Sequence, residues 1–269
     1  MGSRQTRRDR GRGIAGRGEG SGWRCETGAV RVVSLVPSVT ETLVAWGVVP
    51  IACTRFCEQP GIATVGGTKN PDVAAVVALE PDLVVMDEEE NRRQDYQALV
   101  GAGVAVHVLA VRNLADVPSH LSDLAERVGI AVDIPVPGPT LPQRARALVP
   151  IWRRPWMVLG LPTYGASVLA HLGVPVVFPD SRGAYPTVSV EEMAAQVADV
   201  VLAPSEPYPF RERHRAELAE LGGGAPVVLV DGKDLFWWGV RTAPALARLA
   251  QQIATVRTDA AAPGATPIS

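Results

Sequence analysis

The sequence predicts an α/β protein built from two Rossmann-like lobes, each with a parallel sheet. From Arg31 onward, short runs of apolar and β-branched residues alternate with segments of helical period, a pattern typical of β/α units. The second half repeats landmarks of the first half in the same order. The matching pairs are Pro37 with Pro162 and Gly47 with Gly173. Between the halves, 129–155 is rich in proline, which disfavours a helix interior and favours extended chain. We therefore expect two lobes joined by a single proline-rich connector.

The first half alternates strands and helices in a regular order. Gly47 is expected to end the first helix, because glycine tolerates the left-handed backbone that often follows a helix. Asn113 is a natural N-cap for the last helix of this half. The predicted strands are 31–35, 48–53, 82–86 and 104–109. The predicted helices are 37–46, 72–79, 93–101 and 114–128.

The second half repeats this order. Its predicted strands are 156–160, 174–178, 199–203 and 226–230. Its predicted helices begin near Pro162, Val190, Arg211 and Thr242, and Gly173 ends the first of them. Superposing 30–128 on 155–256 is expected to match four strands in the same order.

The ends of the chain differ in composition from its body. Residues 1–28 are basic and rich in glycine and arginine, and 258–269 are rich in alanine, proline and threonine. Both segments bury too little apolar surface to offset chain entropy, so disordered tails are expected. The predicted domains are thus an N-terminal lobe at 29–128, the connector at 129–155 and a C-terminal lobe at 156–257. Because 1–28 lacks the apolar stretch of a secretory signal, a cytoplasmic location is expected. The alternative is the cell envelope, if the N-terminus is misassigned.

Composition argues against several classes of protein. A net charge of -2 lacks the basic footprint of a nucleic-acid binder, and no apolar run is long enough to span a membrane. Three cysteines are too few for a disulfide scaffold, and no zinc spacing is present. The sequence contains neither a G-x-S-x-G elbow nor an H-E-x-x-H helix, so no catalytic residue and no metal ligand is assigned.

The loops that follow the predicted strands hold the candidate binding residues, because open parallel sheets bind ligands at the carboxyl ends of their strands. The turn 66–71, which holds Lys69 and Asn70, either cradles an anion or is a plain turn, and the plain turn is favoured. The acidic run 87–90 either stabilises a helix N-terminus or faces the cleft. These two readings stay open.

Aromatic residues follow the strands of the second half. They are Tyr164, Tyr185, Tyr208, Phe236, Trp237 and Trp238. Together they predict an aromatic cleft wall suited to a large planar or apolar ligand. If Trp237 and Trp238 lie on extended chain, their side chains point to opposite sides, so one is expected to face the ligand and the other the core.

Residues 31–43 and 79–85 resemble the substrate-binding proteins of iron–siderophore, haem and vitamin B12 importers, and the resemblance covers 31–253. The vitamin B12-binding members look most similar, because 185–191 and 234–236 echo their second lobe. This resemblance, to helical backbone metal receptors of ABC transporters, implies a ligand held between two Rossmann-like lobes. It also implies docking to a permease through one acidic residue per lobe. The matching positions are Asp72 and Glu191, whose alternative role is a charge at a helix start.

The predicted function is therefore non-enzymatic binding of a metal chelate or tetrapyrrole, with a corrinoid favoured over a ferric chelate. No intrinsic cofactor is expected, and the chain is expected to be a monomer that partners an ABC permease. Tyrosine and tryptophan rings would give flat contact, lysine and arginine would pair with carboxylates or phosphates, and glutamates would pair with amides or cationic groups. The candidate ligand-binding residues are Pro37, Ser38, Lys69, Asn70, Glu89, Glu90, Arg112, Tyr164, Tyr185, Tyr208, Lys233, Trp237 and Trp238. The alternative is a chelatase-like or metal-handling enzyme, which needs a histidine or carboxylate pair aimed at the cleft centre.

Overall fold

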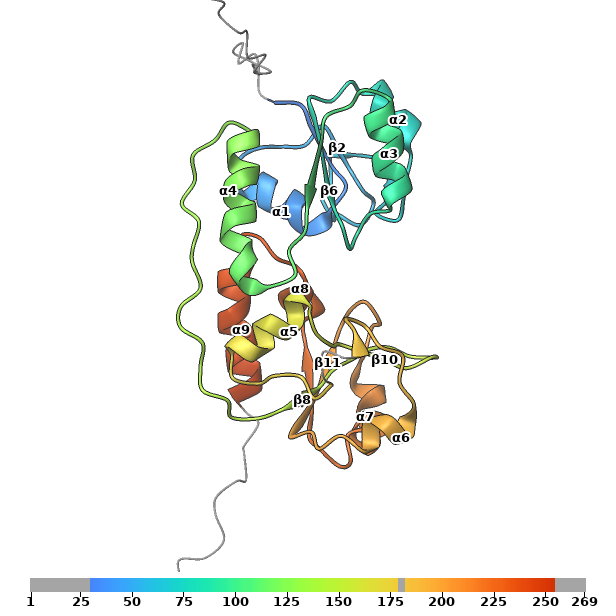
Figure 1. The fold of residues 1–269 in the computed structure, drawn as a ribbon, viewed down its shortest axis with the longest axis vertical. Helices are drawn as coiled ribbons and strands as arrows, with labels where there is room; N and C mark the ends of the chain where they lie inside the picture. The colour runs from blue at the N-terminus through green and yellow to red at the C-terminus, as the bar shows by residue number, and fades with distance from the viewer. Residues whose placement is uncertain (1–29, 179–181, 255–269) are drawn as a thin grey trace, which may run out of the picture.

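The computed structural model describes residues 30–178 and 182–254 of the chain. The predicted tails, 1–28 and 258–269, lie outside the described residues. Two α/β lobes are stacked along the long axis of the molecule (Figure 1). The predicted fold class, two lobes with parallel sheets, is confirmed.

The N-terminal lobe contains a five-stranded parallel sheet in the order β3-β2-β1-β6-β7. Its strands are β1 (Val32–Ser34), β2 (Ala52–Cys53), β3 (Ala63–Thr64), β6 (Leu83–Asp87) and β7 (Val106–Leu109). Its helices are α1 (Pro37–Ala45), α2 (Val73–Ala78), α3 (Arg93–Gly101) and α4 (Val117–Arg127), with the 3-10 turn η1 (Leu114–Asp116) before α4. In the central strand β1, Val32 packs with residues of α1 and α4, whereas Val33 packs with residues of α2 and α3. This alternation buries both faces of the sheet, as expected for parallel strands.

The glycine-rich turn 66–71 is a small hairpin. Strands β4 (Gly66–Gly67) and β5 (Asn70–Pro71) pair antiparallel around Thr68 and Lys69. Gly66 has a φ of +90°, which favours glycine at this position. The segment is therefore a tight turn between two short strands.

The C-terminal lobe contains a parallel sheet in the order β12-β11-β8, extended by a bridge between Ala147 and Val176. Its strands are β8 (Ala147–Leu148), β11 (Val200–Pro204) and β12 (Val227–Val230). A separate antiparallel pair is formed by β9 (Pro150–Trp152) and β10 (Met157–Val158). The helices of the C-terminal lobe are α5 (Tyr164–His171), α6 (Val190–Ala194), α7 (Arg215–Leu221), α8 (Gly232–Phe236) and α9 (Thr242–Ala254). The 3-10 turn η3 (Glu212–His214) precedes α7.

The repeat between the lobes is present, but its second copy starts earlier than predicted. Strand β8 lies between Val176 and β11, as β1 lies between β2 and β6. The counterpart of β1 is thus Ala147–Leu148, inside the segment predicted as connector, and not 156–160. Met157–Val158 pairs with β9 instead, and the strand predicted at 174–178 is reduced to the bridge at Val176. The prolines on either side of this two-residue strand hid it in the sequence pattern.

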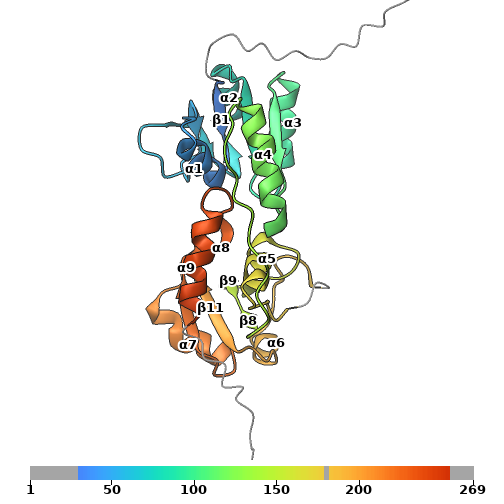
Figure 2. The ribbon, with the colours of Figure 1, turned by 90° about the vertical axis from the view of Figure 1, so that its left-hand side faces the viewer.

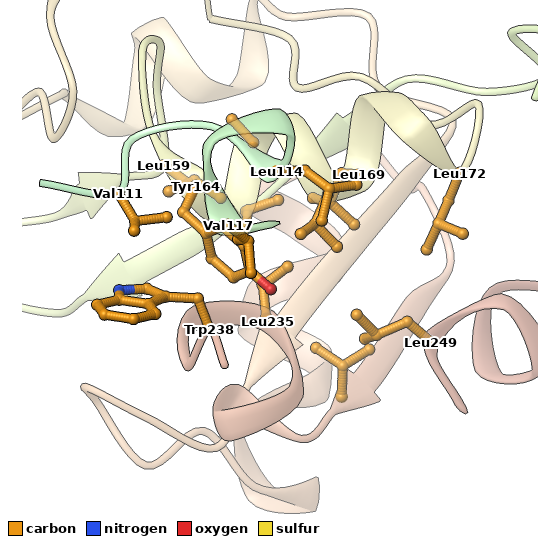
Figure 3. Packing of buried hydrophobic residues seen from close by; sticks show 14 of the residues in the cluster. Val111, Leu114, Val117, Leu159, Tyr164, Leu169, Leu172, Leu235, Trp238 and Leu249 are labelled. Atoms are coloured by element: carbon orange, nitrogen blue, oxygen red, sulfur yellow. The ribbon is translucent and has the colours of Figure 1, made fainter. Parts of the chain in front are cut away.

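The connector between α4 and β8 is extended chain without a helix, and it runs along the outside of the molecule (Figure 1). The lobes are joined by a packed junction rather than by a long helix. Figure 2 shows α5 below α4 and α9 below α1. One hydrophobic cluster continues across both lobes and includes Leu114, Val117, Leu169, Leu235 and Leu249 (Figure 3).

Polar contacts at the same junction join the N-terminal lobe to the segment before α9. The Arg241 guanidinium forms an ion pair with Glu41 at 2.7 Å, and the Val240 N–H donates to Thr42 Oγ1. At Gly239, an added Cβ would lie 2.1 Å from Thr42 Oγ1, so only glycine allows this close approach. In the described part of the chain, no helix combines the length and apolar character that a membrane span requires.

Candidate ligand-binding cleft

A cavity of about 660 Å³ lies between the two lobes. It opens at the carboxyl ends of β1, β6 and β11, where parallel sheets place their ligands. The cavity wall includes eight of the residues predicted from sequence, namely Pro37, Ser38, Glu89, Glu90, Tyr164, Tyr185, Trp237 and Trp238. It also includes Asp87 of the acidic run and Phe236 of the predicted aromatic wall, and four residues that sequence reasoning missed, namely Phe56, Glu58, Trp152 and Glu206.

Asn91 positions the part of the cavity wall at the end of β6, formed by Asp87, Glu89 and Glu90, which we call the cavity floor. Its side-chain amide donates to the backbone oxygens of Leu35 and Thr68, and its Oδ1 accepts from the Asp87 N–H. A single buried side chain thus fixes the loops after β1 and β6 and the hairpin β4–β5 relative to one another. This network holds Asp87 and the following glutamates at the end of β6.

Aromatic rings stand on both sides of the cavity. Phe56 of the N-terminal lobe is 49% exposed, and Trp152 and Tyr185 of the C-terminal lobe are 43% and 40% exposed. Trp237 ends α8, and its ring lies 4.9 Å from Lys233 Nζ. Rings that remain partly open to the cavity can bury large flat area against a ligand.

Trp238 also borders the cavity, but it is only 6% exposed and belongs to the core cluster (Figure 3). Trp237 has extended backbone dihedrals, so successive side chains diverge there. The structure thus distinguishes a tryptophan that faces mainly the cavity from one that packs mainly in the core.

The remaining predicted residues are not part of the cavity wall. They are Lys69, Asn70, Arg112, Tyr208 and Lys233. Lys69 donates to the backbone oxygen of Glu89, Arg112 pairs with Glu88 at 2.7 Å, and Lys233 pairs with Glu58. Asn70 is exposed in the hairpin, and the Tyr208 ring packs on Phe210 and Trp152. Lys69, Arg112 and Lys233 were predicted to pair with anionic groups of a ligand. In the structure, each of them instead bonds to an acceptor of the protein.

Two contacts cross the cleft between the lobes. Tyr185 Oη donates to Glu89 Oε2 at 2.8 Å, and the Lys233 ammonium pairs with the Glu58 carboxylate. Both contacts join the C-terminal lobe to loops of the N-terminal lobe at the cavity, and they are separate from the packed junction.

Burial changes the acidity of groups on the cavity floor. Asp87 is 4% exposed, and burial raises its pKa to about 7, although its Oδ1 accepts from the Glu89 and Glu90 N–H groups. Burial also raises the pKa of Glu90. The pKa of the Tyr185 phenol is raised by burial and by the adjacent Glu89 carboxylate, so this phenol stays protonated at neutral pH.

Replacing Asp87 with asparagine is expected to flatten the pH dependence of stability. Because the pKa of folded Asp87 is raised, the native state keeps a proton that the unfolded state loses, and stability falls as pH rises from about 4 to about 7. The loss in wild type is on the order of 3 kcal/mol. Asparagine keeps the acceptor for the two N–H groups but does not titrate. Denaturant unfolding across this pH range should show the two curves converging at low pH, and parallel curves would contradict the assignment.

Comparisons with known proteins agree with this geometry. No family model matches the chain. The vitamin B12-binding protein of Salmonella typhimurium is 24% identical over 194 residues, which cover 65% of this chain and 72% of that protein. The vitamin B12-binding protein of Pectobacterium carotovorum is 24% identical over 257 residues, covering 88% of this chain and 91% of the relative. The resemblance to the substrate-binding proteins of these importers is confirmed.

Solved structures share the fold of this binding-protein family. The periplasmic vitamin B12 binding protein BtuF of Vibrio cholerae has a TM-score of 0.70 at 17% identity, covering 86% of this chain and 98% of that one. The periplasmic heme-binding protein BhuT has a TM-score of 0.68 at 20% identity, covering 85% and 99%. These proteins are described as binding proteins and as periplasmic. The predicted cytoplasmic location is therefore not supported, and the comparisons agree with the cell-envelope alternative.

Proposed function

We propose that this chain is a non-enzymatic binding protein that holds a macrocyclic metal chelate, a corrinoid, between its lobes and delivers it to an ABC permease in the cell envelope. The observation that carries the proposal is a cavity of about 660 Å³ with aromatic rings on both walls. Stacked rings give large contact area to a flat macrocycle at little conformational cost. Vitamin B12 and haem, named for the similar proteins, are macrocyclic metal chelates of this kind.

The chelatase-like alternative is not favoured. The described cavity wall holds carboxylates, which such an enzyme could use, but no histidine. No group of three or more His, Cys, Asp or Glu side chains that could hold a metal ion occurs in 30–178 and 182–254. The similar proteins are named for binding, which supports the same conclusion.

Ligand binding is tested by titration of the purified protein. Tryptophan fluorescence should be quenched with one-to-one stoichiometry by cyanocobalamin, haemin or a ferric siderophore, because the Trp237 and Trp152 rings border the cavity. Native mass spectrometry should show the same complex with the ligand chemically unchanged. Absence of saturable binding to all three compounds would contradict the proposal.

Permease docking is proposed to use Asp72 and Glu191. Asp72 caps α2 by accepting from the Ala75 N–H, and both carboxylates are exposed. Figure 1 places α2 and α6 on the same side of the molecule, one per lobe. One carboxylate on each lobe could thus contact a permease that spans both lobes.

Removing both docking charges is expected to lower uptake without changing ligand affinity. In Asp72→Asn/Glu191→Gln, asparagine still caps the helix, so the fold should be retained. Uptake of labelled corrinoid by cells of the source organism should fall at least about tenfold, since charge contacts guide and hold such complexes. The control Glu126→Gln removes an exposed charge from α4, on the opposite side of the molecule, and should transport normally. Wild-type uptake by the double variant would contradict this docking assignment.

A further inference from the structure

The charged side chains that face the cavity are all acidic. They are Glu58, Asp87, Glu89, Glu90 and Glu206. Among the described residues of the cavity wall, there is no lysine, arginine or histidine. A site for an anionic ligand would have the opposite balance, because an unpaired carboxylate repels a bound anion and gains nothing from its desolvation.

Several basic residues near the cavity already pair with acidic residues of the protein. Lys233 pairs with Glu58 and packs against Trp237, while Arg112 pairs with Glu88. Arg241 is shared between Glu41 and Asp234. Arg55 stacks on the Phe56 ring at 4.8 Å but is not part of the cavity wall. An anionic ligand would have to break an existing ion pair to engage Lys233, Arg112 or Arg241, while Lys69 donates to the Glu89 backbone oxygen and, like Arg55, is not part of the cavity wall.

The carboxylates that follow β6 have fewer such partners: the Lys69 charge acts on Glu90, whereas Asp87 and Glu89 bind N–H and O–H donors. Asp87 accepts only from backbone N–H groups in its own loop, and Glu89 accepts from Tyr185. Burial raises the pKa of Asp87, which is only 4% exposed, so its charged form is poorly solvated where it stands. Ligand groups that donate hydrogen bonds or carry positive charge would relieve this cost.

We infer that the cavity selects macrocycles whose edge carries amide donors or positive charge, and rejects macrocycles whose edge carries carboxylates. This inference rests on the proposed function and names the ligand chemistry of the same site. A corrinoid with its side-chain amides fits the selection. Haem, with two propionates, and carboxylate-bearing ferric siderophores do not.

An isosteric pair of corrinoids tests the selection. Cyanocobalamin and its monocarboxylic acid, in which one corrin side-chain amide has been hydrolysed, have nearly the same size and differ by one negative charge at pH 7.5. The acid is expected to bind at least about tenfold more weakly in equilibrium dialysis. Haemin is also expected to bind more weakly than cyanocobalamin.

Two sets of variants assign this discrimination to the cavity acids. In Glu89→Gln/Glu90→Gln, the amide-to-acid affinity ratio should shrink to within about threefold, because the charges are lost while the Tyr185 acceptor is kept. Glu58→Gln, at a more exposed carboxylate, should lower the ratio in the same direction and serves if the double variant does not fold. The matched control is Glu88→Gln, whose carboxylate pairs with Arg112 outside the cavity and should keep the wild-type ratio.

The outcomes separate this inference from the proposed function. Equal binding of the amide and the acid by the wild type, or a wild-type ratio in the variants that lack cavity acids, would overturn the selection. Tight binding of haemin together with weak binding of cyanocobalamin would overturn it too, but would leave cleft binding of a macrocycle intact. Failure of every probe to bind would overturn both.

Discussion

Replacing Asp234 with alanine is expected to lower the free energy of unfolding by about 3 kcal/mol, a large fraction of a typical domain's stability. The Asp234 side chain is 1% exposed and accepts from Arg248 at 2.6 Å and from Arg241 at 3.0 Å. The two guanidiniums that remain are partly exposed, so the loss should lie at the low end of the range for a broken buried ion pair. Arg241 also binds Glu41 of the other lobe, so the same change loosens the junction between the lobes.

The pH dependence of this effect has a defined sign. Arg248 and Arg241 lower the pKa of Asp234, so its contribution is present above the ordinary carboxyl pKa and is lost as pH falls through the lowered value in the folded state. The difference between wild type and Asp234→Ala should therefore shrink in acid, below about pH 4.

A surface ion pair of similar geometry supplies the control. Glu212 accepts from Arg215 through two bonds, as Asp234 does from Arg248, but its side chain is 72% exposed. Glu212→Ala should change stability little, because exposed pairs are screened by water. Urea unfolding of both variants measures the comparison. A similar, small loss in both would show that burial of the Asp234 network does not stabilise the junction.

The sequence was most informative where one local rule decides an element. Pro37 begins α1 and Gly47 follows its end with a φ of +80°, as predicted from the rigid proline and the permissive glycine. The strands β6 and β11 also lie where apolar runs predicted them. Each of these signals is contained within a few consecutive residues.

Short elements could not be predicted from periodicity. Helix α8 has five residues and begins after Asp231, which caps it by accepting from the Lys233 N–H, yet the segment was predicted as a loop. Strand β8 has two residues and is specified by its pairing with β11, which lies about fifty residues further along the chain. Tertiary pairing, rather than local sequence, determines these elements.

In the candidate site, too, some residues could be predicted from local sequence, whereas others depend on tertiary contacts. Glu89 and Glu90 could be placed in the cleft because they follow a predicted strand. Phe56 and Glu206 follow β2 and β11, so the same rule could have found them, whereas Trp152 lay in the segment predicted as connector. The engagement of Lys69, Arg112 and Lys233 by protein acceptors depends on which loops face one another. Only the folded structure supplies that information.

Truncating the two adjacent tryptophans is expected to separate binding from stability. Trp237 lines the cavity, and its ring lies 4.9 Å from Lys233 Nζ and 5.6 Å from the Arg241 guanidinium carbon. Trp237→Ala should weaken corrinoid binding by about tenfold to a hundredfold, as expected for a central aromatic contact, with little change in the unfolding midpoint. Trp238 is nearly buried in the core cluster, so Trp238→Ala should instead lower the free energy of unfolding by about 3–5 kcal/mol.

A third tryptophan provides the matched control for this pair. Trp156 stacks on Phe210 within the C-terminal lobe and is not part of the cavity wall. Trp156→Ala should lose packing energy without changing ligand affinity in the folded protein. Parallel cyanocobalamin titrations and thermal melts of the three variants distinguish the roles. If Trp237→Ala binds like wild type, the segment after α8 does not contact the ligand, and the aromatic wall loses its main contribution from the C-terminal lobe.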